Sequence, residues 1–326
     1  MVRRRLGAVG LVCGVAACTP TFVDETAIVS SPRLLAVQAV PAEGALGAGF
    51  TLTALYVDQD GPHDPSGIDW ATCLLQKPLG EPGPINESCF VDASPDLVSL
   101  GDGGIVHGTI PQNACQLFGP DSPPPQMGQP SARPTDPDTT GGFYLPIRTK
   151  SAGGQWSAAL ERIACQPSGI TQSVSLAFSS GYRLNANPTV SALSRIDADG
   201  GASPIAADAA DAGPALTVAA GERVALRVEW PACSGTDACG GAESYLYIDP
   251  ASKQIVTRRE SMVASWYAGA GSFDEDRSGR GETDTATNAE DTWTAPKTPG
   301  PAHLWVVLRD ARGGVGWAAY TVVVEP

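Results

Sequence analysis

The sequence predicts an all-β protein made of two antiparallel β-sandwich domains that follow a cleaved export signal. The chain contains 37 Gly and 28 Pro among 326 residues, a proportion that favours many turns over long helices. Its apolar runs are short, of strand type, and separated by clusters of Gly, Pro and Asp, which is typical of a sandwich. The length suits two ordinary domains, or one large sandwich.

Residues 1–17 have the pattern of a signal peptide. Arg3, Arg4 and Arg5 form a basic start, and residues 6–17 are apolar but too few to span a bilayer. The run ends in Val15-Ala16-Ala17-Cys18, which resembles the lipobox of bacterial lipoproteins, with Val15 where that motif usually has Leu.

This resemblance implies that Cys18 carries a diacylglycerol and becomes the acylated N-terminus of the mature chain. Residues 18–30 would then be a lipid-anchored tether, and the membrane would be a partner through the lipid. Thr19, in place of Asp, points to the outer membrane. The alternative is an ordinary secretory signal in which Cys18 is a coincidence.

The charge of the chain excludes one class of partner. Lys and Arg total 21 against 35 Asp and Glu, which gives a net charge of −14. Loss of residues 1–17 removes three Arg and no acid, so the mature chain carries −17. Such a surface repels phosphate backbones, so we expect no nucleic-acid binding. It suits a soluble extracytoplasmic chain, or one that collects cations.

Six cysteines remain when Cys13 leaves with the signal and Cys18 carries the lipid. An even number in an exported chain predicts three disulfides. Cys233 and Cys239 flank a short polar loop and are expected to pair with each other. The other four allow three pairings, of which proximity favours Cys73–Cys89 with Cys115–Cys165. A zinc site is the alternative, although no paired CxxC motif or neighbouring His supports it.

The first domain is expected over residues 31–185. Its strands are predicted at residues 34–40, 50–57, 68–75, 105–110, 143–147 and 174–178. Residues 119–142, which include Pro123-Pro124-Pro125, are predicted to form a long exposed loop. Trp156, Leu160 and Ile163 are spaced four and three apart, so a short helix is predicted over residues 157–163.

The second domain is expected over residues 186–326. Residues 224–230 alternate, with Val224, Leu226, Val228 and Trp230 on one face, which predicts a half-buried strand. Further strands are predicted at residues 190–196, 245–248, 262–267, 304–308 and 317–324, and a loop at residues 197–214.

The last third of the chain carries a family resemblance. Trp266 in a strand is followed by Thr292-Trp293-Thr294-Ala295-Pro296, a strand through residues 304–308, and the turn Asp310-Ala311-Arg312-Gly313-Gly314. This order resembles PKD-like and related bacterial Ig-like domains. The N-terminal half opens in a similar way, so it is expected to be Ig-like too. The whole chain also resembles a family of lipoproteins from myxobacteria and their relatives, which implies no particular activity.

Chemistry-bearing motifs are scarce. His63, His107 and His303 have no ligand or nucleophile at an informative spacing, and neither a Gly-x-Ser-x-Gly elbow nor a His-Glu-x-x-His motif occurs. Residues 274–282 place Asp274, Asp276, Ser278 and Glu282 at four EF-hand positions, so these residues are candidate calcium ligands. The closing Glu of that loop is absent, because Thr285 takes its position.

These patterns favour a non-enzymatic lipoprotein of the cell envelope that faces the periplasm or the cell surface. Its Ig-like domains would bind an envelope protein or a polysaccharide, or act as a spacer, and no cofactor is expected apart from the calcium alternative. One further alternative is an extracytoplasmic enzyme such as a carbohydrate hydrolase, with acids drawn from distant strands. The other is a calcium-dependent adhesin. Six tryptophans could form a glycan platform but are expected to be core residues, namely Trp156, Trp230, Trp266, Trp293, Trp305 and Trp317.

Overall fold

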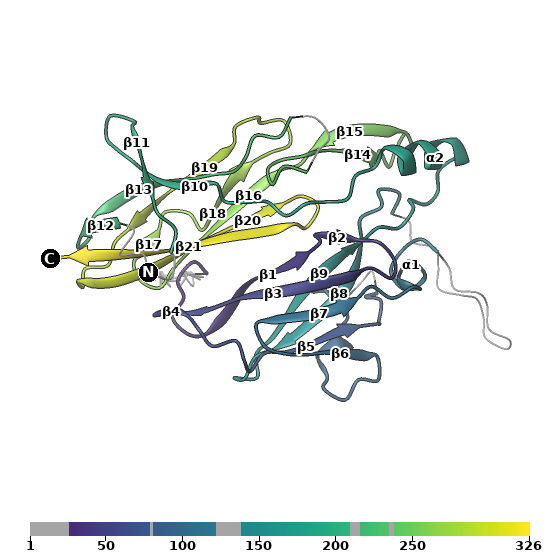
Figure 1. Cartoon of the computed structure of the whole chain (residues 1–326), viewed down its shortest axis with the longest axis horizontal. Helices are drawn as coiled ribbons and strands as arrows, with labels where there is room; N and C mark the ends of the chain where they lie inside the picture. The colour runs from purple at the N-terminus through teal and green to yellow at the C-terminus, as the bar shows by residue number, and fades with distance from the viewer. Residues whose placement is uncertain (1–25, 79–80, 122–137, 209–215, 235–237) are drawn as a thin grey trace, which may run out of the picture.

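The computed structural model describes residues 26–78, 81–121, 138–208, 216–234 and 238–326 (Figure 1). The signal peptide, Cys18 and residues 122–137 of the Pro-rich loop lie outside this part of the chain. The described residues form an all-β protein of packed sheets, so the predicted fold class is confirmed.

Two sheets enclose the core of the N-terminal half. In the first, β3 (Gly49–Asp58) lies between β1 (Arg33–Val40) on one side and β4 (Gly61–Pro62) and β7 (Ile105–Thr109) on the other. The second has the order β2 (Glu43–Gly44), β9 (Trp156–Ile163), β8 (Phe143–Lys150), β5 (Asp69–Cys73) and β6 (Leu97–Asp102). Alternate side chains of both sheets meet in one apolar cluster that includes Phe50, Trp70 and Leu145.

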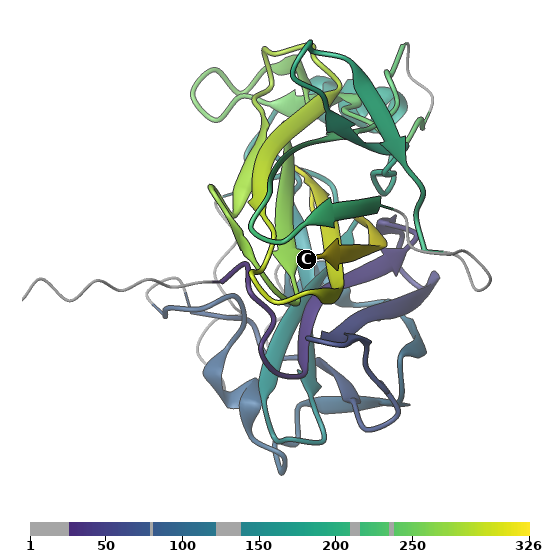
Figure 2. The same cartoon turned by 90° about the vertical axis from the view of Figure 1, so that its left-hand side faces the viewer.

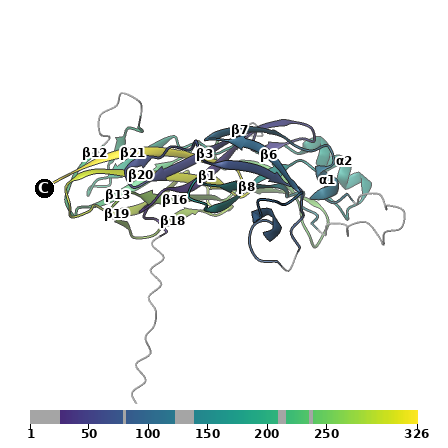
Figure 3. The ribbon, with the colours of Figure 1, turned by 90° about the horizontal axis from the view of Figure 1, so that it is seen from below.

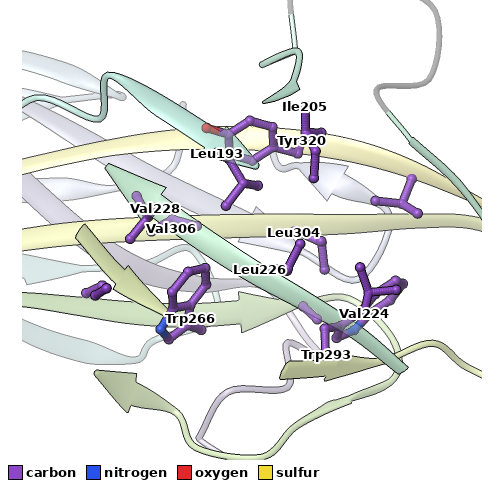
Figure 4. Close-up of a cluster of buried hydrophobic side chains, with 14 of the residues drawn as sticks. Leu193, Ile205, Val224, Leu226, Val228, Trp266, Trp293, Leu304, Val306 and Tyr320 are labelled. Carbon is purple, nitrogen blue, oxygen red and sulfur yellow. The ribbon is translucent and has the colours of Figure 1, made fainter. Parts of the chain in front are cut away.

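The C-terminal half repeats this plan. One sheet has the order β11 (Ala202–Ile205), β10 (Ala192–Ile196), β13 (Arg223–Glu229), β19 (Asn288–Thr294) and β17 (Ser272–Phe273). The other has the order β12 (Leu216–Ala219), β21 (Val315–Glu325), β20 (Gly300–Asp310), β16 (Met262–Ala268) and β18 (Arg277–Arg280). Between them lie Leu226, Trp266 and Trp293 (Figure 4), and β14 (Ser244–Ile248) and β15 (Ile255–Arg259) form a separate hairpin.

The two halves share one topology. The path β1-β3-β7 corresponds to β10-β13-β19, and β2-β9-β8-β5-β6 corresponds to β12-β21-β20-β16-β18. The correspondence includes a parallel pair at the same edge of each larger sheet, β2 with β9 and β12 with β21. In immunoglobulin lettering, β1, β3 and β7 are strands A, B and E of one sheet, and β5, β8 and β9 are strands C, F and G of the other. The same lettering fits the C-terminal half, so both halves have the immunoglobulin strand arrangement.

The halves pack face to face, so four sheets form a stack (Figure 2). A separate apolar cluster joins Leu35, Leu55 and Val57 of β1 and β3 to Trp305 and Val307 of β20. Strand β20 therefore contacts two cores, because Leu304, Val306 and Leu308 point into the C-terminal sandwich. Burial on both faces explains why its apolar run is continuous instead of alternating.

Two secondary-structure predictions were wrong. Residues 157–163 belong to β9, because this segment pairs with β8 along its whole length, and that pairing outweighs an incidental helical spacing. Residues 174–178 lie in helix α2 (Gln172–Gly181), whose first turn is capped by the Thr171 hydroxyl, which accepts from Val174 N–H at 3.5 Å. Strand β11 also lies inside the predicted loop 197–214.

The helices are small and peripheral. Helix α1 (Ala114–Leu117) and α2 lie at the end of the molecule opposite the C-terminus (Figures 1 and 3), and η1 (Glu87–Phe90) is a single 3₁₀ turn. Among the described residues, no helix has the length and apolar content that crossing a membrane would need.

Candidate functional site

A groove lies where the N-terminal sandwich opens beside the C-terminal half. Its volume is about 640 Å³. One wall is β1, a second is the 157–160 stretch of β9, and the third is the β20–β21 turn with its flanking residues Arg309 and Val315. Both β1 and most of β9 are sheet edges, so the gap between them is not closed by a strand. A groove of this volume is in the range of ligand and peptide sites.

Most of the residues that line the groove are apolar, although polar and apolar atoms contribute about equally to its exposed surface. Leu34, Val37 and Ala39 contribute from β1, Leu52 from β3, and Ala159 from β9. Four residues with polar side chains also line it, Tyr144, Ser157, Arg309 and Asp310.

A polar seam holds the β1 wall against the C-terminal half. The Arg309 guanidinium donates to the Leu35 carbonyl at 3.0 Å, and the Gln38 amide donates to the Val315 carbonyl at 2.7 Å. Asn187 joins both walls, because its Nδ2 donates to the Ala39 carbonyl at 2.6 Å while its Oδ1 accepts from Val315 N–H at 2.9 Å. These bonds set the position of β1 against the β20–β21 hairpin.

A buried ionic network lies beside the groove, and its first part is centred on Glu43. Glu43 is 1% exposed and accepts from the Tyr182 hydroxyl at 2.9 Å and from Asn185 N–H at 2.9 Å. The Arg162 guanidinium lies 3.3 Å from the same carboxylate and donates to the hydroxyls of Tyr144 and Tyr182. The segment between the halves is thereby tied to the N-terminal sandwich.

The second part is centred on Arg312 in the β20–β21 turn. Its Nε donates to Glu260 at 2.6 Å and its Nη2 donates to Glu243 at 2.9 Å, and Arg312 itself is 2% exposed. Asp310 accepts from the Asn185 amide at 3.2 Å and from the backbone N–H groups of Arg312 and Gly314. The turn that resembles an Asp-x-x-Gly-Gly motif is thus held in its conformation by hydrogen bonds to Asp310 and by the ion pairs of Arg312.

The network holds more acid than base. Four of its carboxyl groups are buried, against two guanidinium groups, Arg162 and Arg312; the carboxyls belong to Glu43, Glu243, Glu260 and Asp310. Burial, and then the neighbouring Asp310, raises the pKa of Glu260 to about 7. Burial likewise raises the pKa of Asp310. Proton uptake on these groups relieves the excess of negative charge.

Glu161 is a further buried acid, on the inward face of β9. It is 0% exposed, and neither carboxyl oxygen has a hydrogen-bond partner among the described residues. Burial, and then Glu43, raises its pKa to about 8. A methyl group at Gly44 would lie 3.6 Å from Glu161 Oε1, which places the carboxyl against the β2 edge of the sheet.

The cysteines form the pairs that proximity favours. Cys73 bonds to Cys89, Cys115 to Cys165, and Cys233 to Cys239. Three disulfides indicate an exported chain, since cytosolic proteins are kept reduced.

The expected calcium ligands do not converge, so that prediction is corrected. Asp274 pairs with Arg223 at 2.6 Å, Asp276 accepts from Thr26, the Ser278 hydroxyl accepts from the Trp266 indole at 2.9 Å, and Glu282 faces Arg258. Ser278 also lies in strand β18, where backbone pairing with β16 replaces the loop geometry that calcium needs. Within the described ranges, no group of three or more His, Cys, Asp or Glu residues could hold a metal ion.

The histidines lie apart from the groove. His63 contacts Asp58 at 2.6 Å, His107 contacts Thr51 at 3.0 Å, and His303 contacts Thr321 at 3.3 Å. The Asp58–His63 pair, five residues apart, was not singled out by the sequence motifs. Each histidine has a local partner on its own strand or on a neighbouring segment.

Neither the groove nor the network was predicted from sequence. One signal was present, the apolar run of β20, whose Trp305 and Val307 would be exposed if the C-terminal half stood alone. Such a run indicates a covered second face. The pairing of Arg312 with Glu243 and Glu260 left no signal in the sequence, because Arg312 follows Glu260 by 52 positions and Glu243 by 69 positions.

Comparisons with known proteins give fold-level likenesses only. No family model matches the chain, and no curated protein matches it. Fibronectin(III)-like modules of Clostridium thermocellum CbhA are 8% identical over 89% of this chain and 94% of theirs, with a TM-score of 0.24. The Yersinia pseudotuberculosis adhesin InvE is 12% identical over 89% of this chain and 58% of its own, with a TM-score of 0.20. At these values the likenesses carry no functional argument.

Proposed function

We propose that the chain is a non-enzymatic lipoprotein of the cell envelope, anchored through Cys18, that binds an envelope partner through the groove. The groove carries this proposal, because its walls come from both Ig-like domains and are held in place before any partner arrives. The Arg309, Gln38 and Asn187 bonds fix the walls. A preformed groove binds with a smaller ordering cost than a flexible one.

The lining supports binding over hydrolysis. A carbohydrate hydrolase would need two carboxyl groups that face one cleft. Among the described residues, Asp310 is the one acid that lines the groove, and its oxygens accept from Asn185 and two backbone N–H groups. The other buried acids of the network are held by Arg162, Arg312 or backbone N–H groups.

The burial of most tryptophans favours a protein partner over a polysaccharide. Glycan platforms present exposed aromatic faces. Trp230, Trp266, Trp293 and Trp305 are buried in the described structure, and the ring of Trp156 is flanked by Arg148 and Lys150 at 4.8 and 4.7 Å. The lipobox-like Val15-Ala16-Ala17-Cys18 supports the anchor, and membership of a myxobacterial-type lipoprotein family belongs to the same proposal.

Site-specific photocrosslinking in intact cells of the host tests the binding role. A benzophenone amino acid at Leu160, which lines the groove, should give a crosslinked species that mass spectrometry identifies as one envelope protein. The same amino acid at Arg227, on the outer face of β13, is the control. Equal crosslinking at the two positions would contradict the groove as a binding site and leave a spacer role.

Intact mass spectrometry of the detergent-extracted native protein tests the anchor. We expect a chain that begins at Cys18, is heavier by two or three acyl groups, and is lighter by the six hydrogens of three disulfides. An unmodified mass with cleavage at another position would contradict the anchor and indicate a freely secreted protein.

A further inference from the structure

The β9 wall of the groove is a sheet edge whose outward backbone groups have no hydrogen-bond partner among the described residues over Ala158 to Leu160. Strand β2 pairs with only the last two residues of β9, Arg162 and Ile163. Ala164 N–H bonds to the Gly44 carbonyl on that side, and β9 pairs with β8 without a register shift. Because backbone groups alternate in direction along a strand, the N–H and C=O of Leu160 and Ala158 point away from β8, toward the groove.

In the C-terminal domain, the strand that corresponds to β9 is β21, and other segments of the chain pair with its outer edge. There β12 pairs in parallel with Val322, Val323, Val324 and Glu325 of β21. Farther along β21, Asp208 bonds to the Ala319 carbonyl and to Thr321 N–H, and Asn187 bonds to Val315 N–H. Segments of the chain therefore bond to the outer edge of β21 along most of its length. On β9, the pairing with β2 stops at Arg162.

The uncovered stretch of β9 also lacks the usual protection of an edge strand. Free edges normally carry Lys, Pro, a bulge or an inward charge that prevents pairing with another chain. The sequence Ser157-Ala158-Ala159-Leu160 has no charge and no Pro, and its ladder has no bulge. The neighbouring edge β1, in contrast, has a register shift between Leu34 and Ala36 and is followed by Pro41.

We propose that the groove takes an extended segment of the partner polypeptide, which adds as a strand to the free edge of β9 beside β2. This proposal rests on the proposed function and names its binding mode. The N–H and C=O groups of Ala158 and Leu160 pair with the segment, as in other complexes formed by strand addition. The partner segment should carry small apolar side chains at alternate positions, those that face into the groove, because Val37, Leu52 and Ala159 line the groove there.

A peptide selection with a backbone variant tests this mode. Random peptides of about twelve residues, displayed on phage, are selected on the purified full chain, and enriched sequences are synthesised for affinity measurement. Ala158→Pro removes one outward N–H while leaving the β8 ladder intact, and Ala158→Val is its control of similar volume with the N–H retained. Thermal melting of both variants confirms that they fold.

Ala158→Pro should weaken peptide binding by about ten-fold or more, while Ala158→Val should stay within about two-fold of the parent. Hydrogen exchange should show protection of the Ala158 and Leu160 amides in the bound state. Equal affinities of the two variants, or no enriched peptide, would overturn strand addition. A dimer of the chain alone that Ala158→Pro dissolves would assign the edge to a second copy and also overturn it. The crosslinking experiment at Leu160 tests whether the groove binds a partner at all. Its outcome is therefore distinguishable from a failure of strand addition, which the Ala158 variants test.

Discussion

At the scale of single residues, Glu161 is the most unusual group of the N-terminal domain. A carboxyl with no partner in a sandwich core opposes folding whenever it is ionised. Its pKa of about 8, against 4.5 for an ordinary Glu, means that the folded state binds this proton more tightly than the unfolded state. The free energy of unfolding therefore falls as the pH rises from about 4.5 to about 8, and it levels off above that.

Glu161→Met should raise the free energy of unfolding, by about 1 to 3 kcal/mol at pH 8, because it removes an unpaired buried polar group while keeping a similar volume. It should also reduce the decline of stability between pH 5 and pH 8, to which Glu260, with its pKa of about 7, contributes as well. Urea titrations at three pH values measure both effects. Glu325→Gln, a change at an exposed acid, is the control and should leave the decline in place. A pH profile that Glu161→Met does not alter would contradict the assignment.

At the scale of elements, the β20–β21 hairpin connects the fold to the groove. Its strands supply the wall residues Arg309 and Val315, and its turn supplies Arg312, which meets two glutamates from either end of the β14–β15 hairpin. The turn is therefore the point where the C-terminal sandwich, the separate hairpin and the 182–187 segment are tied together.

Arg312→Met should lower the free energy of unfolding by about 3 to 5 kcal/mol at pH 8, because Glu243 and Glu260 would be left buried without a cation. The loss should be smaller at pH 5, because Glu260, whose pKa is about 7, is protonated there. Chemical denaturation at the two pH values measures the difference. Equal losses at both would mean that packing, and not charge, is what Arg312 contributes.

Sequence patterns predicted most strands of both domains for a physical reason. A strand with one buried face must alternate, and residues 224–230 do so, as β13 confirms. The patterns failed where backbone pairing decided the outcome. Trp156, Leu160 and Ile163 lie at helical spacing, yet β8 offers a full ladder to that segment. Residues 174–178 were predicted to form a strand, yet the Thr171 hydroxyl caps a helix that begins at Gln172, of which only Phe178 is buried.

At the scale of the whole molecule, an apolar cluster joins the two domains. The cluster of Leu35, Leu55, Val57, Trp305 and Val307 closes the face between them. An apolar interface of this kind couples the unfolding of the domains, because exposure of either face costs free energy.

Val307→Asp should separate the domains while each keeps its fold, because Val307 points into the interface and would face water in a free C-terminal domain. Calorimetry should then show two transitions in place of one. Val306→Asp is the matched control, since the neighbouring Val306 points into the sandwich core and its replacement should unfold the C-terminal domain. A single transition for Val307→Asp at the parent temperature would show that the domains are not coupled through this face.

The sequence by itself determined the all-β class, most strand positions and the six cysteines that pair, because these follow from local composition and from alternation along each strand. Only the tertiary structure decided the packing of the two domains, the groove between β1 and β9, and the meeting of Arg312 with Glu243 and Glu260. Those features join residues that are far apart in the chain, and their position depends on how the sheets stack. Likewise, the four candidate calcium ligands were close in sequence, but strand pairing and nearby arginines turned them to separate partners.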